Sequence, residues 1–186
     1  MPSQETIFDR AIHELGQAVN RIDEADVDRL VERTSDARHV SVFGCGREGL
    51  QIRGFAMRLF HLGRSVSVVG DMTTPPIGPG DLFLVTAGPG MLPTALALAR
   101  VARAAGARVM CITADPAGAV PRECDDVLVL PAQTMATDQG DDTSSLPMGS
   151  VYEGGLFLLF EIAVLKLKQK LGVSDQAMRA NHTNLE

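Results

Sequence analysis

The sequence contains no tryptophan and one tyrosine among its 186 residues. It therefore offers no set of aromatic side chains on which nucleic-acid bases could stack. Lysine and arginine (17) are outnumbered by aspartate and glutamate (23), which gives a formal net charge of -6 at pH 7. A chain with this charge and no basic cluster is not expected to bind a phosphate backbone. We therefore predict no nucleic-acid partner.

The sequence also has few residues suited to disulfides or metals. Its three cysteines, Cys45, Cys111 and Cys124, lack zinc-type spacing and cannot all pair, which is typical of a reducing compartment. The four histidines are scattered, so we predict no bound metal and no cofactor. We find no candidate membrane span, and the first residues lack the basic and apolar regions of a signal peptide. These absences predict a cytoplasmic protein with no membrane partner.

The length of the chain suits one substantial core and is too short for two ordinary domains, so residues 1–186 are predicted to form a single domain. From residue 5 to about residue 31, apolar residues recur at helical spacing with charged residues between them. This pattern predicts one amphipathic helix, within residues 1–34, ahead of the main fold. The polar residues 172–186 are predicted to form a C-terminal tail.

Five short apolar segments between these ends have the composition of β-strands. They are residues 39–43, 65–69, 81–87, 107–113 and 127–130. Helical spacing returns over residues 50–62 and 92–105, and residues 149–171 predict a long helix that is apolar nearly all round. Apolar strands that alternate with helices indicate an α/β fold: a doubly wound, five-stranded parallel sheet with helices on both faces.

Ligands of such sheets bind beyond the carboxyl ends of the strands. Four segments are expected at that edge: the glycine turns Gly44-Cys45-Gly46 and Gly88-Pro89-Gly90, the Thr73-Thr74 turn, and the polar loop before Glu153. We therefore predict that one cleft collects all of these candidates.

Glu153 is the most informative single residue, because it places a carboxylate in the first turn of the apolar helix. Pro147 can open this helix and Ser150 can cap it. Partial burial would raise the pKa of Glu153 while the helix N-terminus lowers it, which leaves an ionised and poorly solvated group suited to removing a proton next to a carbonyl. The alternative is a solvated glutamate that only stabilises the helix dipole, and this segment alone favours that alternative.

The turn from Gly44 to Gly49 has the G-x-G-x-x-G spacing of dinucleotide-binding loops. The acidic residue needed for a ribose would be Asp71, which lies in a turn rather than at a strand end. Glu48 would also face the phosphates of such a ligand. The spacing is therefore a weak signal for a nicotinamide cofactor.

A set of motifs along nearly the whole chain resembles the 6-phospho-3-hexuloisomerases of the sugar isomerase (SIS) domain superfamily. The motifs are Gly44-x-Gly46-Arg47-x-Gly49, Phe55-Ala56-Met57-Arg58-Leu59-x-His61-Leu62-Gly63, Thr73-Thr74-Pro75, Pro147-Met148-Gly149-Ser150-x-x-Glu153 and His182-x-Asn184-Leu185-Glu186. The resemblance implies a five-stranded parallel sandwich and a homotetramer with shared active sites. It also implies an intramolecular oxidoreductase that interconverts D-arabino-3-hexulose 6-phosphate and D-fructose 6-phosphate. The apolar helix at residues 149–171 is expected to lie either at the centre of the core or in a subunit interface, and we expect a homo-oligomer, either a tetramer or a dimer.

The resemblance implies roles for individual residues. Glu153 is the catalytic base, and His182 or His61 moves protons between the two substrate oxygens. Both histidines stay open, since a lone histidine such as His61 is more often structural. The implied substrate-binding residues are Gly44, Gly46, Arg47, Glu48, Thr73, Thr74, Gly88, Gly90 and Ser150.

Two departures from the family pattern concern phosphate binding. The family usually carries serine where this chain has Glu48, and its third strand usually runs into a serine-rich turn where this chain has Ala87-Gly88-Pro89-Gly90. A serine hydroxyl donates to phosphate oxygens, whereas a carboxylate repels them and Pro89 lacks an N–H. We expect Glu48 either to pair with Arg47 and weaken phosphate affinity, or to point into solvent. Two alternatives stay open: an isomerase of an unphosphorylated sugar, and a non-catalytic SIS-type sugar-binding or sensor domain.

Overall fold

The computed structural model of the protein describes residues 5–139 and 144–185. Five strands form one sheet in the order β2-β1-β3-β4-β5, and each neighbouring pair is parallel. This confirms the predicted α/β fold with a five-stranded parallel sheet. The strands are β1 (Val40–Phe43), β2 (Val66–Val68), β3 (Leu82–Thr86), β4 (Arg108–Thr113) and β5 (Asp126–Val129).

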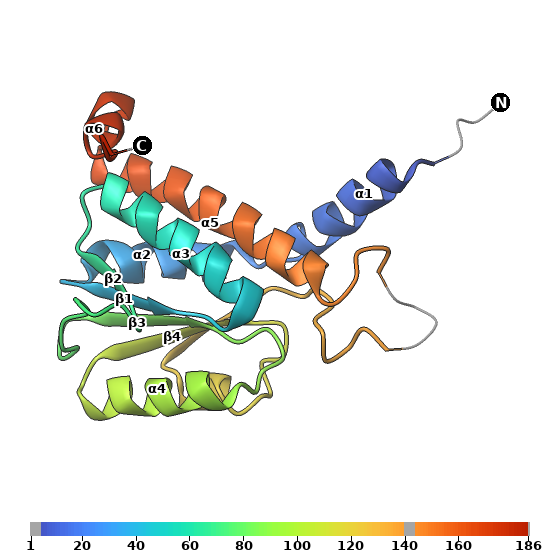
Figure 1. Cartoon of the computed structure of the whole chain (residues 1–186), viewed down its shortest axis with the longest axis horizontal. Helices are drawn as coiled ribbons and strands as arrows, with labels where there is room; N and C mark the ends of the chain where they lie inside the picture. The colour runs from blue at the N-terminus through green and yellow to red at the C-terminus, as the bar shows by residue number, and fades with distance from the viewer. Residues whose placement is uncertain (1–4, 140–143, 186) are drawn as a thin grey trace.

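Helices cover both faces of the sheet, as predicted (Figure 1). On one face, α3 (Gly46–His61) and α5 (Ser150–Leu171) run side by side, and α2 (Glu24–Asp36) packs against α5. On the other face, α4 (Pro93–Ala104) packs on β3 and β4 together with the short 3₁₀ helix η1 (Pro121–Glu123). Because α3 directly follows β1, its first turn lies at the carboxyl ends of the strands.

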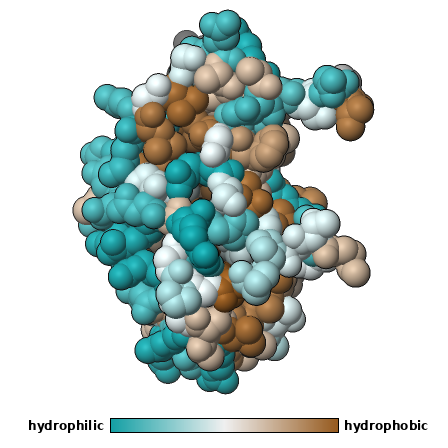
Figure 2. All heavy atoms as spheres, turned by 90° about the vertical axis from the view of Figure 1, so that its left-hand side faces the viewer, coloured by the Kyte–Doolittle hydropathy of each residue, from teal (hydrophilic) through white to brown (hydrophobic). Residues whose placement is uncertain are grey.

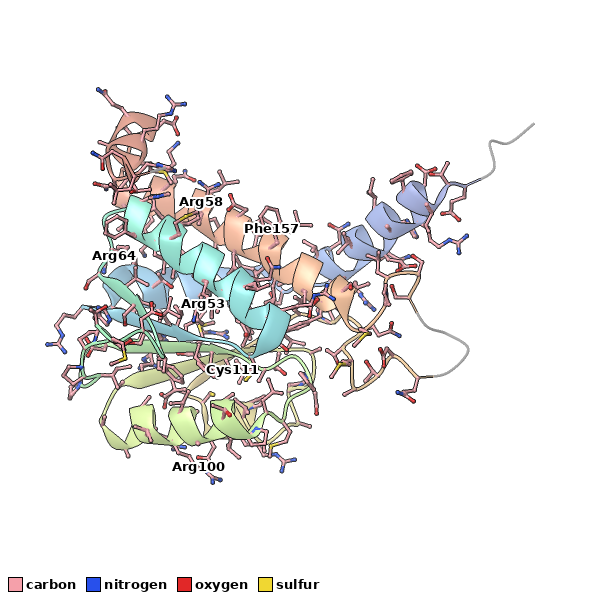
Figure 3. All side chains as sticks on the ribbon, viewed as in Figure 1. Arg53, Arg58, Arg64, Arg100, Cys111 and Phe157 are labelled. Atoms are coloured by element: carbon pink, nitrogen blue, oxygen red, sulfur yellow. The ribbon has the colours of Figure 1, made fainter. Side chains whose placement is uncertain are left out.

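The sheet separates two buried apolar clusters. The larger lies between the sheet and helices α2, α3 and α5, where Phe55 stacks on Phe160 with ring centroids 4.6 Å apart. Complete burial of a side chain of this size stabilises the fold by about 1.5–3 kcal/mol. The smaller cluster lies under α4 and includes Ala99 and Cys111; Figure 3 shows Cys111 in the sheet layer.

The N-terminal segment differs from its prediction, because it forms two helices instead of one. Helix α1 (Ile7–Val19) begins after Thr6, whose side chain caps it, and ends at Asn20. Asp23 then caps the start of α2. The apolar spacing continues through both helices, but α1 ends at Asn20 and Asp23 caps a new helix, so the backbone hydrogen bonding is interrupted between them. The single helix predicted within residues 1–34 is therefore wrong. The first four residues of that range lie outside the described part of the chain.

Two further boundaries differ. The helix predicted from residue 50 begins at Gly46, which places Glu48 in its first turn. The tail predicted over residues 172–186 contains α6 (Asp175–Ala180), capped by Ser174. A helix of six residues is too short to show apolar periodicity, which is why the sequence pattern missed it. Glu186, at the end of the tail motif, lies outside the described residues.

Within residues 5–139 and 144–185, no helix is long and apolar enough to cross a membrane. The same residues contain no group of three histidine, cysteine, aspartate or glutamate side chains that could hold a metal ion. Cys45, Cys111 and Cys124 are free thiols.

Asp81 is a buried carboxylate that fixes the amino end of β3. It accepts hydrogen bonds from Arg38 Nε at 2.9 Å, from Arg38 Nη2 at 2.8 Å and from Gly78 N at 2.9 Å, and its side chain is 1% exposed. These bonds, led by those from Arg38, hold the pKa of Asp81 below its ordinary value of 3.8. The resulting stabilisation is complete above that value and is lost as the pH falls through the lower pKa of the folded state.

We predict that Asp81→Asn lowers the free energy of unfolding by about 2–4 kcal/mol at pH 7, because Arg38 and the Gly78 N–H lose a charged acceptor. Asp175→Asn is the control, because Asp175 pairs with Lys168 at the surface and is 74% exposed. Its substitution should cost much less, because solvent screens an exposed ion pair. Urea unfolding at pH 7 and near pH 3 measures both effects. Equal effects of the two substitutions, or a penalty for Asp81→Asn that persists undiminished near pH 3, would contradict the prediction.

Candidate active site

A cleft of about 350 Å³ opens between the first turns of α3 and α5, at the carboxyl ends of the strands. Its walls come from the turns after β1 and β3, the loop before α5 and α5 itself. The polar side chains that line it include Arg47, Glu48, Thr134 and Glu153. This volume suits a molecule the size of a sugar.

The start of α5 is shaped by Gly149, which adopts the left-handed conformation with φ of 78°. A Cβ atom at this position would lie 2.9 Å from Met135 N, so glycine lets the preceding loop approach the helix. Gly149 is the N-cap residue, and the predicted cap at Ser150 is therefore wrong. The Ser150 hydroxyl instead donates to Pro147 O at 2.6 Å and accepts from Arg47 Nη2 at 3.0 Å, which ties this loop to α3.

Glu153 lies in the cleft with its side chain 13% exposed, and its Oε2 is 2.5 Å from Nη2 of Arg47 in an ion pair. Burial raises the pKa of Glu153, and the charge and hydrogen bond of Arg47 oppose that rise. The carboxylate shares the cleft with Thr134 and Met135 of the preceding loop, as its place in the sequence predicts. It is partly desolvated and held by an arginine, so it is not a solvated carboxylate that serves only the helix dipole.

Glu48 is buried at 9% exposure, and both of its carboxylate oxygens accept the N–H of Gly88 at 3.1 Å. Burial is the main reason that its pKa rises to about 7; the Gly88 hydrogen bond opposes the rise and the charge of Glu153 adds to it. Neither expectation for Glu48 is met, because Arg47 pairs with Glu153 and the Glu48 side chain is largely buried at the cleft instead of pointing into solvent.

Tyr152 closes the back of the cleft, and the sequence patterns did not identify it. Its hydroxyl donates to Ile112 O at 2.9 Å, and its ring packs so closely on Gly88 that a Cβ atom there would lie 2.8 Å from the ring. The patterns also missed Thr134, which is buried in the polar loop. The sequence offered two signals for these residues: a tyrosine next to Glu153 in an apolar helix, and a polar loop before that helix. Neither signal identifies a binding residue on its own.

The Thr73-Thr74 turn does not line this cleft. Thr74 Oγ1 donates to the carbonyl oxygens of Val68 and Asp71, both at 2.8 Å, so it closes the turn after β2. The prediction that one cleft of the chain collects all four segments is therefore wrong for this turn, because it follows the edge strand β2, whereas the cleft is built on the turns after β1 and β3.

His61 and His182 lie together at the opposite end of α3. Their ring centroids are 5.1 Å apart, and Asn181 Nδ2 donates to His61 O at 3.0 Å, so the C-terminal tail docks on α3 of the same chain. Both histidines line a separate cavity of about 240 Å³. Because an α-helix rises 1.5 Å per residue, His61 lies about 21 Å along α3 from Arg47. Within a single chain, neither histidine therefore comes near Glu153.

The SIS domain family matches residues 34–151, which is more than half of the chain. The protein therefore belongs to the SIS domain family. Among curated relatives named 3-hexulose-6-phosphate isomerase, the protein of Bacillus subtilis is 30% identical over 94% of this chain and 95% of its own length. The protein of that name in Mycobacterium gastri is 35% identical over 93% of this chain and 86% of its own length.

A solved structure from Methanococcus jannaschii, for which a 3-hexulose-6-phosphate isomerase function has been inferred, is also similar. It matches with a TM-score of 0.83 at 26% identity, over 96% of this chain and 98% of that one. The fold and family expected from the motifs are thereby confirmed, and the names of the relatives indicate an isomerase.

We predict that Arg47→Met raises the pKa of Glu153 further, because it removes the cation that opposes the effect of burial. Carbon-13 NMR titration of the glutamate carboxyl groups measures this pKa, with Glu153→Gln used to assign the resonance. Arg53→Met is the control, since Arg53 lies on the same helix and its nearest carboxylate is Asp71, 3.8 Å from Nη1. A pKa of Glu153 that stays the same or falls in Arg47→Met would show that the ion pair does not govern this group.

Proposed function

We propose that the protein is an intramolecular oxidoreductase that interconverts a 3-ketose and the corresponding 2-ketose through an enediol. The observation that carries this proposal is the position of Glu153, a partly buried carboxylate in a sugar-sized cleft at the carboxyl ends of the strands. The curated relatives named 3-hexulose-6-phosphate isomerase support a hexulose skeleton for the substrate.

In the proposed reaction, Glu153 takes the proton from the hydroxyl-bearing carbon next to the carbonyl. The electron pair of that C–H bond becomes the C=C bond of the enediol, and the carbonyl oxygen gains a proton. A proton then returns to the former carbonyl carbon while the neighbouring hydroxyl loses its proton and becomes the new carbonyl. Arg47 favours the ionised form of Glu153 and holds its carboxylate in the cleft.

This reaction needs a second group that moves protons between the two oxygens. The Tyr152 hydroxyl is bonded to Ile112 O, and no described residue that lines the cleft is a histidine. His182 or His61 can serve only if another subunit brings it to the cleft, because both lie at the far end of α3 from Glu153. We therefore include a shared active site in the proposal.

Exposed apolar side chains support association of subunits. Helix α1 projects from the body of the subunit (Figure 1), and its Ile7, Phe8 and Ile12 are largely exposed. On α5, Phe157 is half exposed and points away from the sheet (Figure 3). Figure 2 shows another face, on which hydrophobic patches are interspersed with hydrophilic residues. Because a solvated monomer gains nothing from apolar side chains on a projecting helix, we propose that a second copy of the chain covers α1 and the outer face of α5.

We predict that Glu153→Gln keeps the fold and loses turnover by about 10³-fold or more, because the amide has nearly the same shape but cannot accept the proton. Solvent deuterium incorporation at the carbon next to the carbonyl of a ketose measures proton removal directly. Glu123→Gln is the control, because Glu123 also pairs with arginine but lies on η1, away from the cleft. Near-native exchange in Glu153→Gln would exclude Glu153 as the base.

We predict that the native protein is larger than a monomer by light scattering, and that mixed assemblies restore activity. Glu153→Gln and His182→Ala subunits, each poorly active alone, should regain activity when unfolded together and refolded, because some sites then receive both native residues. The same two variants refolded separately and then combined provide the control. A stable native monomer, or a co-refolded mixture no more active than its parents, would contradict a shared site that uses His182.

A further inference from the structure

Residues 88–90, in the turn after β3, offer no free backbone donor to a ligand in the cleft. The N–H of Gly88 donates to Glu48, Pro89 has no N–H, and the N–H of Gly90 donates to Ala87 O at 2.8 Å. A phosphate group needs several such donors to replace its hydration. At this turn, the place of an external anion is already taken by the carboxylate of Glu48.

The first turn of α3 leads to the same conclusion. A helix N-terminus favours an anion, and Glu48 supplies that negative charge from within the turn. Gly88, which the carboxylate contacts, is also packed against the Tyr152 ring, so this position is fixed by the surrounding structure. A second anion placed here would lie beside a buried carboxylate.

The charge balance of the cleft adds a third observation. Among the described residues that line it, Arg47 is the only basic residue, while Glu48 and Glu153 are both acidic. Arg47 is engaged with Glu153, and no salt bridge is formed by Glu48 among the described residues. The rise of the Glu48 pKa to about 7, caused mainly by burial, agrees with a carboxylate whose charge no cation balances.

We infer that the cleft takes a ketose without a phosphate group, and that Glu48 is the residue that determines this specificity. Above its pKa of about 7 the Glu48 side chain is ionised, and its carboxylate then accepts a hydrogen bond from a hydroxyl of the neutral sugar, at a place where a phosphate would meet a like charge. That the substrate is a ketose rests on the proposed function, whereas the absence of a phosphate group rests on the geometry and charge of the cleft. This specificity distinguishes the chain from its relatives named for a phosphorylated substrate.

The first experiment tests binding and needs no turnover. Calorimetry with inorganic phosphate and with fructose 6-phosphate, above pH 8, compares the native protein with Glu48→Gln and Glu48→Ser. Glutamine keeps the shape and a hydrogen-bond acceptor but removes the charge, and serine also adds a hydroxyl donor. We expect at least about a tenfold gain in affinity for one or both ligands in each variant, because the opposing charge is gone. Glu123→Gln, on η1, should leave both affinities unchanged.

A smaller gain in both Glu48 variants would overturn the inference, and so would native affinity for fructose 6-phosphate in the micromolar range. Thermal unfolding of each variant establishes that it is folded. Glu48→Gln is suited to this purpose, because it replaces a buried charge by a neutral group of the same size.

The second experiment follows deuterium incorporation by the native protein into free ketoses and their 6-phosphates. We expect faster labelling of a free ketose than of its phosphate, and faster labelling of the phosphate would overturn the inference. If no ketose of either kind is labelled, the proposed isomerase function fails, and the binding experiment still decides whether Glu48 excludes phosphate.

Discussion

The parallel packing of α3 against α5 determines where the candidate residues of this protein lie. At the start of both helices, Arg47 meets Glu153; in the last turn of α3, Arg58 Nε donates to Glu161 Oε1 at 3.0 Å. Phe55 stacks on Phe160 between these two ion pairs. This register creates the cleft, since it brings the turn after β1 to the loop before α5. It also keeps His61 and His182 at the end of α3 that is far from the cleft.

The sequence predicts well what depends on local patterns. The segment around Glu153 did not specify its partial burial, since that segment alone favoured a solvated side chain. Apolar strands separated by helices specified the parallel sheet, and the position of Glu153 after the last strand placed it at the carboxyl edge. Both follow from the chain's periodicity and from general rules for doubly wound sheets. The motifs added the family, which the SIS domain match to residues 34–151 confirms.

Other features depend on contacts between distant segments, and the sequence does not specify them. The burial of Glu48 requires Gly88, forty positions away, to present its N–H, and the sequence alone favoured an ion pair with Arg47 or exposure to solvent. The prediction that Thr73-Thr74 shares a cleft with the glycine turns was wrong, because the order of segments along the chain does not determine how far apart they lie across the sheet. The break before α2 was missed because two capping residues are a weaker signal than apolar spacing that continues through them.

Two carboxylates and one guanidinium share the cleft, and the way they pair bears on both chemistry and specificity. Arg47 reaches Glu153 and so favours the ionised form in the residue that is proposed to accept a proton. Glu48 receives a single backbone N–H, and its charge is left without a cation in a buried position. If Arg47 paired with Glu48 instead, the pKa of Glu153 would rise further, so Glu153 would be a stronger base but less of it would be ionised at neutral pH. The charge of Glu48 would then be balanced by Arg47. The observed pairing therefore supports proton removal by Glu153, and above the Glu48 pKa of about 7 it leaves an unbalanced negative charge in the proposed ligand site. Such a charge repels a phosphate and accepts a hydrogen bond from a hydroxyl.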